Sequence, residues 1–322
     1  MKEDNITEIL PPYKHLNIYG YRNYFQSLIK LYEVGNLPNT MLFSGPRGIG
    51  KSTFAYHFAN YLLSQNEDNK YSIEENKINK NNKSYNLVCN NSHPNLFILE
   101  NDINTTNIKI DSVRNLINFL NKTTYSSNLK IVILDNVEFL NENSSNALLK
   151  ALEEPGKSTF FFIIHDSTRK LLETIVSRSL VFKLFFSSNE KKEIFEKIIK
   201  SYNFDFDINK LNNFFYYDSP GNLVKYLSIF DKNISKNLDN KLLCISFLIE
   251  KYKKLNNPEI LTYISTFIEF FYYELSLKNL SNINYYFRRK YNVLRQIDNL
   301  KKFNIDKENF FISLNGILGN ES

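Results

Sequence analysis

Five short apolar runs recur between residues 40 and 186, and each is almost continuously hydrophobic rather than alternating. Such runs are typical of parallel β-strands that are buried on both faces of a sheet. Segments with helical spacing separate them, so the pattern predicts an α/β domain with a parallel sheet. The predicted strands are Thr40–Ser44, Leu96–Glu100, Lys130–Asp135, Thr159–His165 and Leu180–Phe186. The predicted helices are Lys51–Leu63, Asp111–Leu120, Ser144–Glu153 and Arg169–Val176.

The pattern changes in two places. Residues 64–92 are polar, rich in Asn and Lys, and long for a loop, so we expect a mobile insertion there. After Phe186 the strand-like runs stop, which places the end of the first domain, 1–186, at this point. Residues 187–232 read as a small helical unit, and residues 233–322 as long amphipathic helices rich in Phe, Tyr and Leu. Aromatic stripes at helical spacing are typical of a core or a subunit interface, so the last domain is expected to pack against partner chains.

Composition narrows the class of protein. Hydrophobic residues make up 43% of the chain, which is enough to bury real cores and excludes disorder over most of its length. A net charge of +6 fits association with nucleic acid without establishing it. The 2 cysteines cannot build a disulfide framework or a four-ligand zinc site, and no apolar run is long enough to span a membrane. We therefore expect a cytoplasmic protein without zinc.

One motif carries clear chemistry. Residues 45–52, read as GPRGIGKS, match the phosphate-loop pattern GxxxxGK[ST], and they lie between a predicted strand and a predicted helix. Successive backbone N–H groups and the helix dipole of such a loop bind phosphate, the lysine reaches the β- and γ-phosphates, and the Ser hydroxyl contacts Mg²⁺. The sequence predicts a site for ATP with Mg²⁺. The residues expected to bind it are Gly45, Pro46, Gly48, Ile49, Gly50, Lys51, Ser52 and Thr53.

The strand at 130–135 ends in a carboxylate. Asp135 is the expected second contact of Mg²⁺, beside Ser52. The next residue is Asn136, whose amide cannot accept the proton of an attacking water. Loss of a positioned general base costs roughly 10²–10⁴-fold in rate. Glu138 would lie on the same side as Asn136 only if the strand continued, so we regard it as a weak substitute.

Several blocks together resemble the delta-prime family of bacterial DNA polymerase III clamp-loader subunits, within the AAA+ ATPases. These blocks are LPNTMLFSGPRGIGKSTFAYHFANYLL, SHPNLFILE, KIVILDNVEFLNENSSNALLKALEEP, LLETIVSRSLVFKL and SPGNLVKYL, and they cover residues of roughly 10–230. The resemblance implies an AAA+ nucleotide domain over 1–186, a helical lid over 187–232 and an all-α collar over 233–322. It also implies assembly through the collar with other clamp-loader subunits, including ATPase and delta-like subunits. Such an assembly opens the sliding clamp and places it on primed DNA as part of a DNA polymerase holoenzyme.

The resemblance assigns a role to one arginine. Family members carry a Ser-Arg-Cys motif whose Arg reaches the γ-phosphate in the neighbouring subunit, and here the motif is Ser177-Arg178-Ser179. Such a finger raises the rate by roughly 10³–10⁵-fold at the site that it completes. From the residues alone, Arg178 is also placed to stabilise a helix C-terminus; the finger is the favoured role, and the two roles can coexist.

Two departures from the family pattern bear on activity. Relatives often carry a four-cysteine zinc module before the second strand, where this chain has Cys89 alone, and active relatives carry a lid arginine where this chain has Gly221. With Asn136, these differences imply that nucleotide is held with weak or no hydrolysis. The alternatives are a self-sufficient AAA+ clamp-loader motor and, less favoured, a P-loop helicase that processes DNA. His165 ends a strand near the family's polar sensor residue, although a hydrogen-bonded structural histidine is the favoured interpretation.

Overall fold

The computed structural model describes residues 9–100, 110–122, 129–140, 142–156, 158–204, 218–230, 237–302 and 307–319. The chain divides into two compact units. The first contains everything described up to Asn203, together with residues 218–224. The second contains Phe204 and the described residues from Lys225 onward, so one boundary lies inside a helix.

A parallel sheet of five strands forms the centre of the first unit, which confirms the predicted fold class. Its strand order is β2-β3-β4-β1-β5, and all neighbouring strands pair in parallel. The strand bounds are β1 Thr40–Gly45, β2 Leu96–Leu99, β3 Lys130–Leu134, β4 Thr159–Asp166 and β5 Leu180–Lys183. Since ligands of such sheets bind beyond the carboxyl ends of the strands, the ends of β1, β3 and β4 mark the edge where a site is expected.

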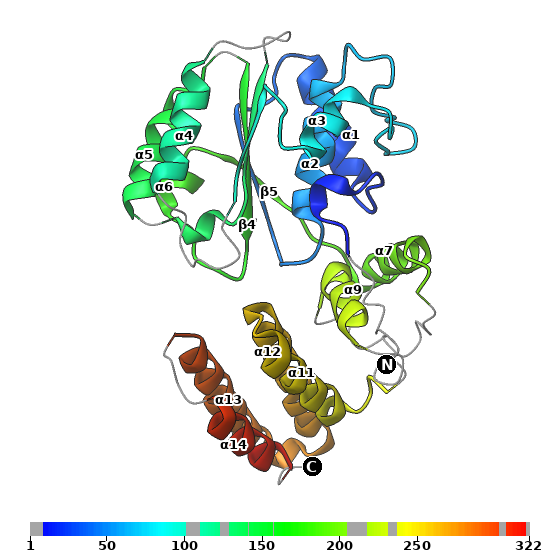
Figure 1. The fold of residues 1–322 in the computed structure, drawn as a ribbon, viewed down its shortest axis with the longest axis vertical. Coiled ribbons are helices and arrows are strands. Elements are labelled where there is room, and N and C mark those ends of the chain that lie inside the picture. Colours follow the sequence, from blue (N-terminus) through cyan, green and yellow to red (C-terminus); the bar gives the residue numbers. More distant parts are fainter. Residues whose placement is uncertain are drawn as a thin grey trace. The chain divides into compact units, whose positions relative to one another are not determined.

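Helices cover both faces of the sheet, as the continuous apolar strands require (Figure 1). One face carries α1 (Arg22–Glu33), α2 (Lys51–Leu63) and α3 (Lys83–Cys89), and the other carries α4 (Ile110–Asn121), α5 (Glu142–Glu153) and α6 (Glu173–Val176). Each face has its own buried cluster. The first is strongly aromatic: Phe25, Phe54 and Phe58 are fully buried and meet edge to face.

The prediction of a mobile insertion at 64–92 is wrong. The segment is folded against α2 and contains α3, whose N-cap Asn82 accepts a hydrogen bond from the Asn60 side chain of α2 at 2.9 Å. Tyr71 is buried and stacks on Phe25 at a centroid distance of 5.0 Å. The carboxylate of Glu67 accepts from the first free N–H groups of α3. These contacts lie far apart in sequence, so the polar composition concealed them.

The predicted helix Arg169–Val176 is also too long, because only Glu173–Val176 is helical. The carboxylate of Asp166, at the end of β4, accepts from the backbone N–H and the hydroxyl of Thr168. This local turn competes with the helix and delays its start.

Two further helices follow the sheet in sequence. Helix α7 (Ser188–Ser201) begins with a capping box between Ser187 and Glu190, and α9 (Pro220–Ile229) begins with a proline at its first position. Helix α7 and the start of α9, which the sequence assigns to the lid, belong to the first unit. The middle of the predicted lid, residues 205–217, lies outside the described residues.

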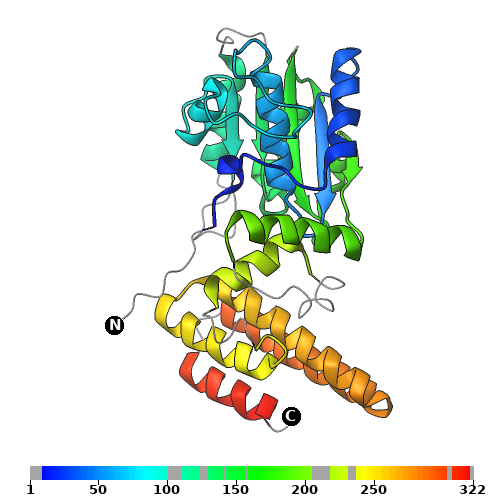
Figure 2. The same ribbon diagram turned by 90° about the vertical axis from the view of Figure 1, so that its right-hand side faces the viewer.

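The second unit is helical throughout its described part, as expected for an all-α C-terminal domain. Its helices, beyond the end of α9, are α11 (Lys241–Leu255), α12 (Pro258–Lys278), α13 (Ile283–Lys302) and α14 (Lys307–Gly319). Figure 2 shows α12 and α13 alongside each other, in agreement with their close packing. No described helix is long and apolar enough to cross a membrane.

Candidate functional site

The phosphate loop joins β1 to α2, as the motif predicts. Strand β1 ends at Gly45, helix α2 starts at Lys51, and the loop between them is tightly curled. Gly48 and Gly50 have φ angles of +80° and +89°, a region that side chains disfavour. The glycines of the motif are therefore required by the backbone, and the hydroxyl of Tyr21 holds the loop by donating to Ile49 O at 2.8 Å.

Lys51 is folded back over this loop. Its Nζ donates to Gly45 O at 2.8 Å and to Pro46 O at 2.7 Å, and the residue is only 6% exposed. Burial lowers the pKa of the Lys51 ammonium, and the carboxylates of Asp166, Asp135 and Glu138 oppose that shift. The ammonium therefore lies against the first two residues of the loop, and phosphate oxygens are suited to replace its two carbonyl partners.

Ser52 and Asp135 come together although they are distant in sequence. The Ser52 hydroxyl donates to Asp135 Oδ2 at 2.7 Å, and Asp135 follows directly after β3. Burial raises the pKa of the Asp135 carboxyl, and the hydrogen bonds from Ser52 and from the Asn136 backbone counteract this. Two adjacent hard oxygen donors of this kind fit Mg²⁺, which takes one or two protein oxygens and completes its shell with phosphate and water oxygens. Within the described residues, no cluster of three His, Cys, Asp or Glu side chains is arranged to hold a metal ion without such help.

The backbone conformation at residue 136 favours asparagine, and this asparagine also removes a carboxylate from the site. Its backbone lies in the left-handed region, at φ 58° and ψ 46°, where Asn is tolerated better than most residues. The strand ends there, as predicted, and a 3₁₀ turn, η2 (Val137–Phe139), begins. This turn carries Glu138 toward Asp166: burial raises the pKa of the Glu138 carboxyl, and the backbone N–H groups of Glu138 and Asp166 counteract the shift. Reasoning from strand periodicity made Glu138 a weak substitute, because periodicity has no means of detecting the turn.

The start of α9 packs directly on the phosphate loop. The Gly221 N–H donates to Gly48 O at 2.9 Å, and a Cβ at Gly221 would lie 2.4 Å from the same oxygen. No side chain fits at residue 221 while the loop keeps this conformation. The sequence of α9, Pro220–Ile229, contains no arginine at all, so this helix offers no guanidinium to a nucleotide.

Arg178 lies between α6 and β5, where the sequence placed it. Its guanidinium pairs with the Glu153 carboxylate at the end of α5 and donates to Thr174 O at 3.0 Å. The side chain is 31% exposed. The helix-capping contact is therefore present within this chain, and enough of the side chain remains accessible for a second role.

The two inner histidines have structural partners. His165 Nε2 donates to Arg169 O at 3.0 Å, while its Nδ1 lies 3.1 Å from the Ser44 hydroxyl. His57 is fully buried and is held between the Tyr71 hydroxyl and His15 O. Burial lowers the pKa of His57 to about 3. Neither ring leaves a nitrogen for a ligand.

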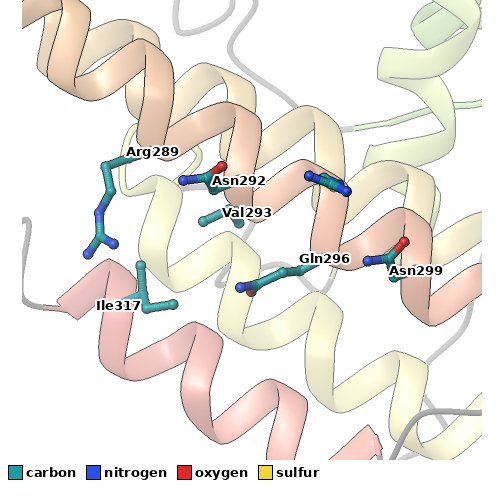
Figure 3. Close-up of a pocket in the computed structure, with 7 residues that line it drawn as sticks. Arg289, Asn292, Val293, Gln296, Asn299 and Ile317 are labelled. Carbon is teal, nitrogen blue, oxygen red and sulfur yellow. The ribbon is translucent and has the colours of Figure 1, made fainter.

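A separate hollow lies in the second unit, between α13 and α14 (Figure 3). It measures about 330 Å³. Its lining is polar and basic, and none of it belongs to the phosphate loop. The lining residues are Arg289, Asn292, Val293, Arg295, Gln296, Asn299 and Ile317. The charge run that the sequence shows at 288–290 thus contributes one arginine to a groove.

Comparison with known proteins links this geometry to a family. Residues 20–187 match the family described as DNA polymerase III, delta subunit, which is just over half of the chain. A DNA polymerase III subunit delta' of Pseudomonas aeruginosa is 37% identical over 42% of this chain and 40% of its own length. This chain thus aligns with less than half of that relative.

Longer matches have lower identity. A DNA polymerase III subunit gamma of Buchnera aphidicola subsp. Acyrthosiphon pisum is 27% identical over 76% of this chain and 67% of its own length. A subunit delta' of Buchnera aphidicola subsp. Schizaphis graminum is 28% identical over 66% and 67%. The matched family region contains the phosphate loop, Asp135 and Arg178. The chain therefore belongs to the family described as DNA polymerase III, delta subunit.

Proposed function

We propose that this chain is a clamp-loader subunit of a DNA polymerase III holoenzyme, which helps to place the sliding clamp on primed DNA. It acts in the cytoplasm, in assembly with other clamp-loader subunits that it meets through its C-terminal helices. The observation that carries the proposal is the pairing of Ser52 with Asp135 beside an intact phosphate loop, in a member of this family.

Within the assembly, the chain holds ATP with Mg²⁺ and hydrolyses it poorly. The loop N–H groups and Lys51 bind the phosphates, and Ser52 with Asp135 supplies oxygen ligands for Mg²⁺, which neutralises phosphate charge when bound. Asn136 offers no carboxylate, and Gly221 leaves no room for a lid arginine. Both differences remove groups that stabilise the transition state, so this subunit is expected to retain nucleotide.

Arg178 acts on the site of a neighbouring subunit. In the isolated chain, Glu153 neutralises its guanidinium, and the partial exposure of the side chain allows it to exchange that carboxylate for a phosphate. The guanidinium N–H groups that pair with Glu153 are the same donors with which arginine binds phosphate. Glu153 thus serves as a resting partner for the finger.

Reconstitution of the clamp loader tests this assignment. Arg178→Ala is expected to leave the chain folded and to lower the ATPase rate of the assembly by roughly 10³-fold at the affected site. Glu153→Ala is the matched control, because it removes the resting partner and leaves the arginine in place, so the ATPase rate should be retained. An assembly whose rate is unaffected by Arg178→Ala would reduce Arg178 to a helix cap.

The isolated chain tests the nucleotide part. Fluorescent ATP should bind in the presence of Mg²⁺, Lys51→Ala should abolish the binding, and turnover should stay low. Rapid turnover by the chain alone, lost in Lys51→Ala, would instead identify a self-sufficient motor.

A further inference from the structure

A carboxylate stands close to the phosphate loop in addition to Asp135. Glu138 lies in the middle of the turn η2, and burial raises the pKa of its carboxyl while the nearby backbone N–H groups of Glu138 and Asp166 counteract this. Asp166 pairs in register with Gly45, the residue at which the phosphate loop begins. The Glu138 carboxylate therefore lies near the carboxyl edge of the sheet, beside the end of the strand β4 that pairs with β1.

One oxygen of this carboxylate has no partner. Glu138 Oε2 is buried and makes no hydrogen bond, although a buried acceptor without a donor costs about 1–3 kcal/mol. Native structures rarely leave such an atom unsatisfied without a functional reason. The Glu138 carboxylate interacts electrostatically with the ammonium of Lys51, the lysine expected to bind the terminal phosphates.

The neighbouring acids and bases are otherwise engaged. Asp135 accepts from Ser52, and the Asp166 carboxylate accepts from Thr168. His165 is held by Ser44 and Arg169. Of these groups around the loop, Glu138 is the one with a buried oxygen that has no donor, and a water molecule can donate to it.

We propose that Glu138 is the water-orienting carboxylate of this site, in the role that the amide of Asn136 cannot fill. A water molecule donates one hydrogen bond to Glu138 Oε2 and attacks the terminal phosphorus. Its oxygen bonds to phosphorus as the bond from phosphorus to the bridging oxygen breaks. The electron pair of that bond stays on the departing diphosphate, and the proton of the water passes to Glu138. The slow turnover of this subunit runs through that residue.

The proposal deepens the proposed function and rests on its nucleotide site. It also makes a prediction that does not depend on turnover. A buried negative charge at the terminal-phosphate end repels ATP more than ADP, so Glu138 should lower the affinity for ATP relative to ADP. In Glu138→Gln, ATP should bind about three- to tenfold more tightly relative to ADP than in the unaltered chain.

The experiment measures the dissociation constants of Mg-ATP and Mg-ADP, and single-turnover hydrolysis of ATP, on the full chain. Glu138→Gln should raise the relative affinity for ATP and lower hydrolysis by roughly 10²-fold or more. Glu138→Asp keeps the charge but withdraws the carboxylate, so the affinity ratio should stay near that of the unaltered chain while hydrolysis falls. Glu74→Gln, an exposed carboxylate in the 64–92 segment, is the control and should change neither.

Circular dichroism establishes that each variant is folded. An unchanged ratio of ATP to ADP affinity in folded Glu138→Gln overturns the proposal for Glu138 and leaves the nucleotide site intact. A chain that binds neither nucleotide overturns both the site and the proposal, so the two failures are distinguishable.

Discussion

Gly221→Ala sets two physical effects against each other at the contact between α9 and the phosphate loop. Gly221 is the second residue of α9, and its N–H donates to Gly48 O at 2.9 Å. An added Cβ would lie 2.4 Å from that oxygen and 3.2 Å from Gly48 C. Both atoms are backbone, so the clash cannot be relieved by rotating a side chain.

The balance of these effects gives the sign. Replacing glycine by alanine in a helix is worth up to about 1 kcal/mol in favour of alanine. Overpacking a close contact costs about 1–3 kcal/mol, and displacing the hydrogen bond costs about 0.5–1.5 kcal/mol more. The net expectation is a loss of about 1–3 kcal/mol from the free energy of unfolding of the first unit.

Urea denaturation followed by circular dichroism measures this loss, and the chain provides a matched control. Gly316 lies inside α14, and an added Cβ there would meet nothing within 4 Å. Gly316→Ala should therefore stabilise the second unit by about 0.5–1 kcal/mol. If Gly221→Ala is as stabilising as Gly316→Ala, the close contact between α9 and the phosphate loop does not exist in solution.

Three further predictions concern stability. Asn136→Glu should lower the free energy of unfolding by about 1 kcal/mol, because φ is 58° there, whereas Asn136→Gly should not; equal urea midpoints would contradict this reasoning. His57 should make the first unit less stable as pH falls from 6.5 toward about 3, since the unfolded ring takes up a proton that the buried ring, with its lowered pKa, refuses. The slope from this group is at most about 1.4 kcal/mol per pH unit, and a His57→Gln variant with an unchanged slope would exclude His57 as its source. Glu67→Ala should cost about 1 kcal/mol in thermal unfolding through the lost cap of α3, and a variant as stable as Glu74→Ala would show that the cap contributes nothing.

Local signals in the sequence were sufficient for much of the first unit. The continuous apolar runs predicted all five strands of the sheet, with ends that differ by no more than a few residues. The phosphate-loop motif placed Lys51 at the start of α2, and Asp135 was correctly set at the end of β3. These features follow from hydrophobic periodicity and from glycine stereochemistry. Both act over a few residues and can therefore be recognised in the sequence alone.

Other features depended on contacts that no local pattern contains. The segment 64–92 is polar in composition, yet Tyr71 and Ile78 are buried in the core of the first face. The capping of α3 by Glu67 joins residues 16 and 17 positions apart. Composition indicates only that the segment is polar on average. It cannot reveal that a few of its side chains, such as Tyr71 and Ile78, are buried.

The sequence by itself determined that this chain is an α/β protein with a phosphate loop, an aspartate at the end of a central strand and no carboxylate at residue 136. Only the tertiary structure decided that Gly221 excludes a side chain, that Arg178 rests on Glu153, and that Glu138 is turned back to the sheet edge beside the loop. The reason is physical. Motifs specify backbone conformation over a few residues, whereas the partners of a charged side chain are set by which strands become neighbours, and that depends on the order β2-β3-β4-β1-β5 of the whole sheet.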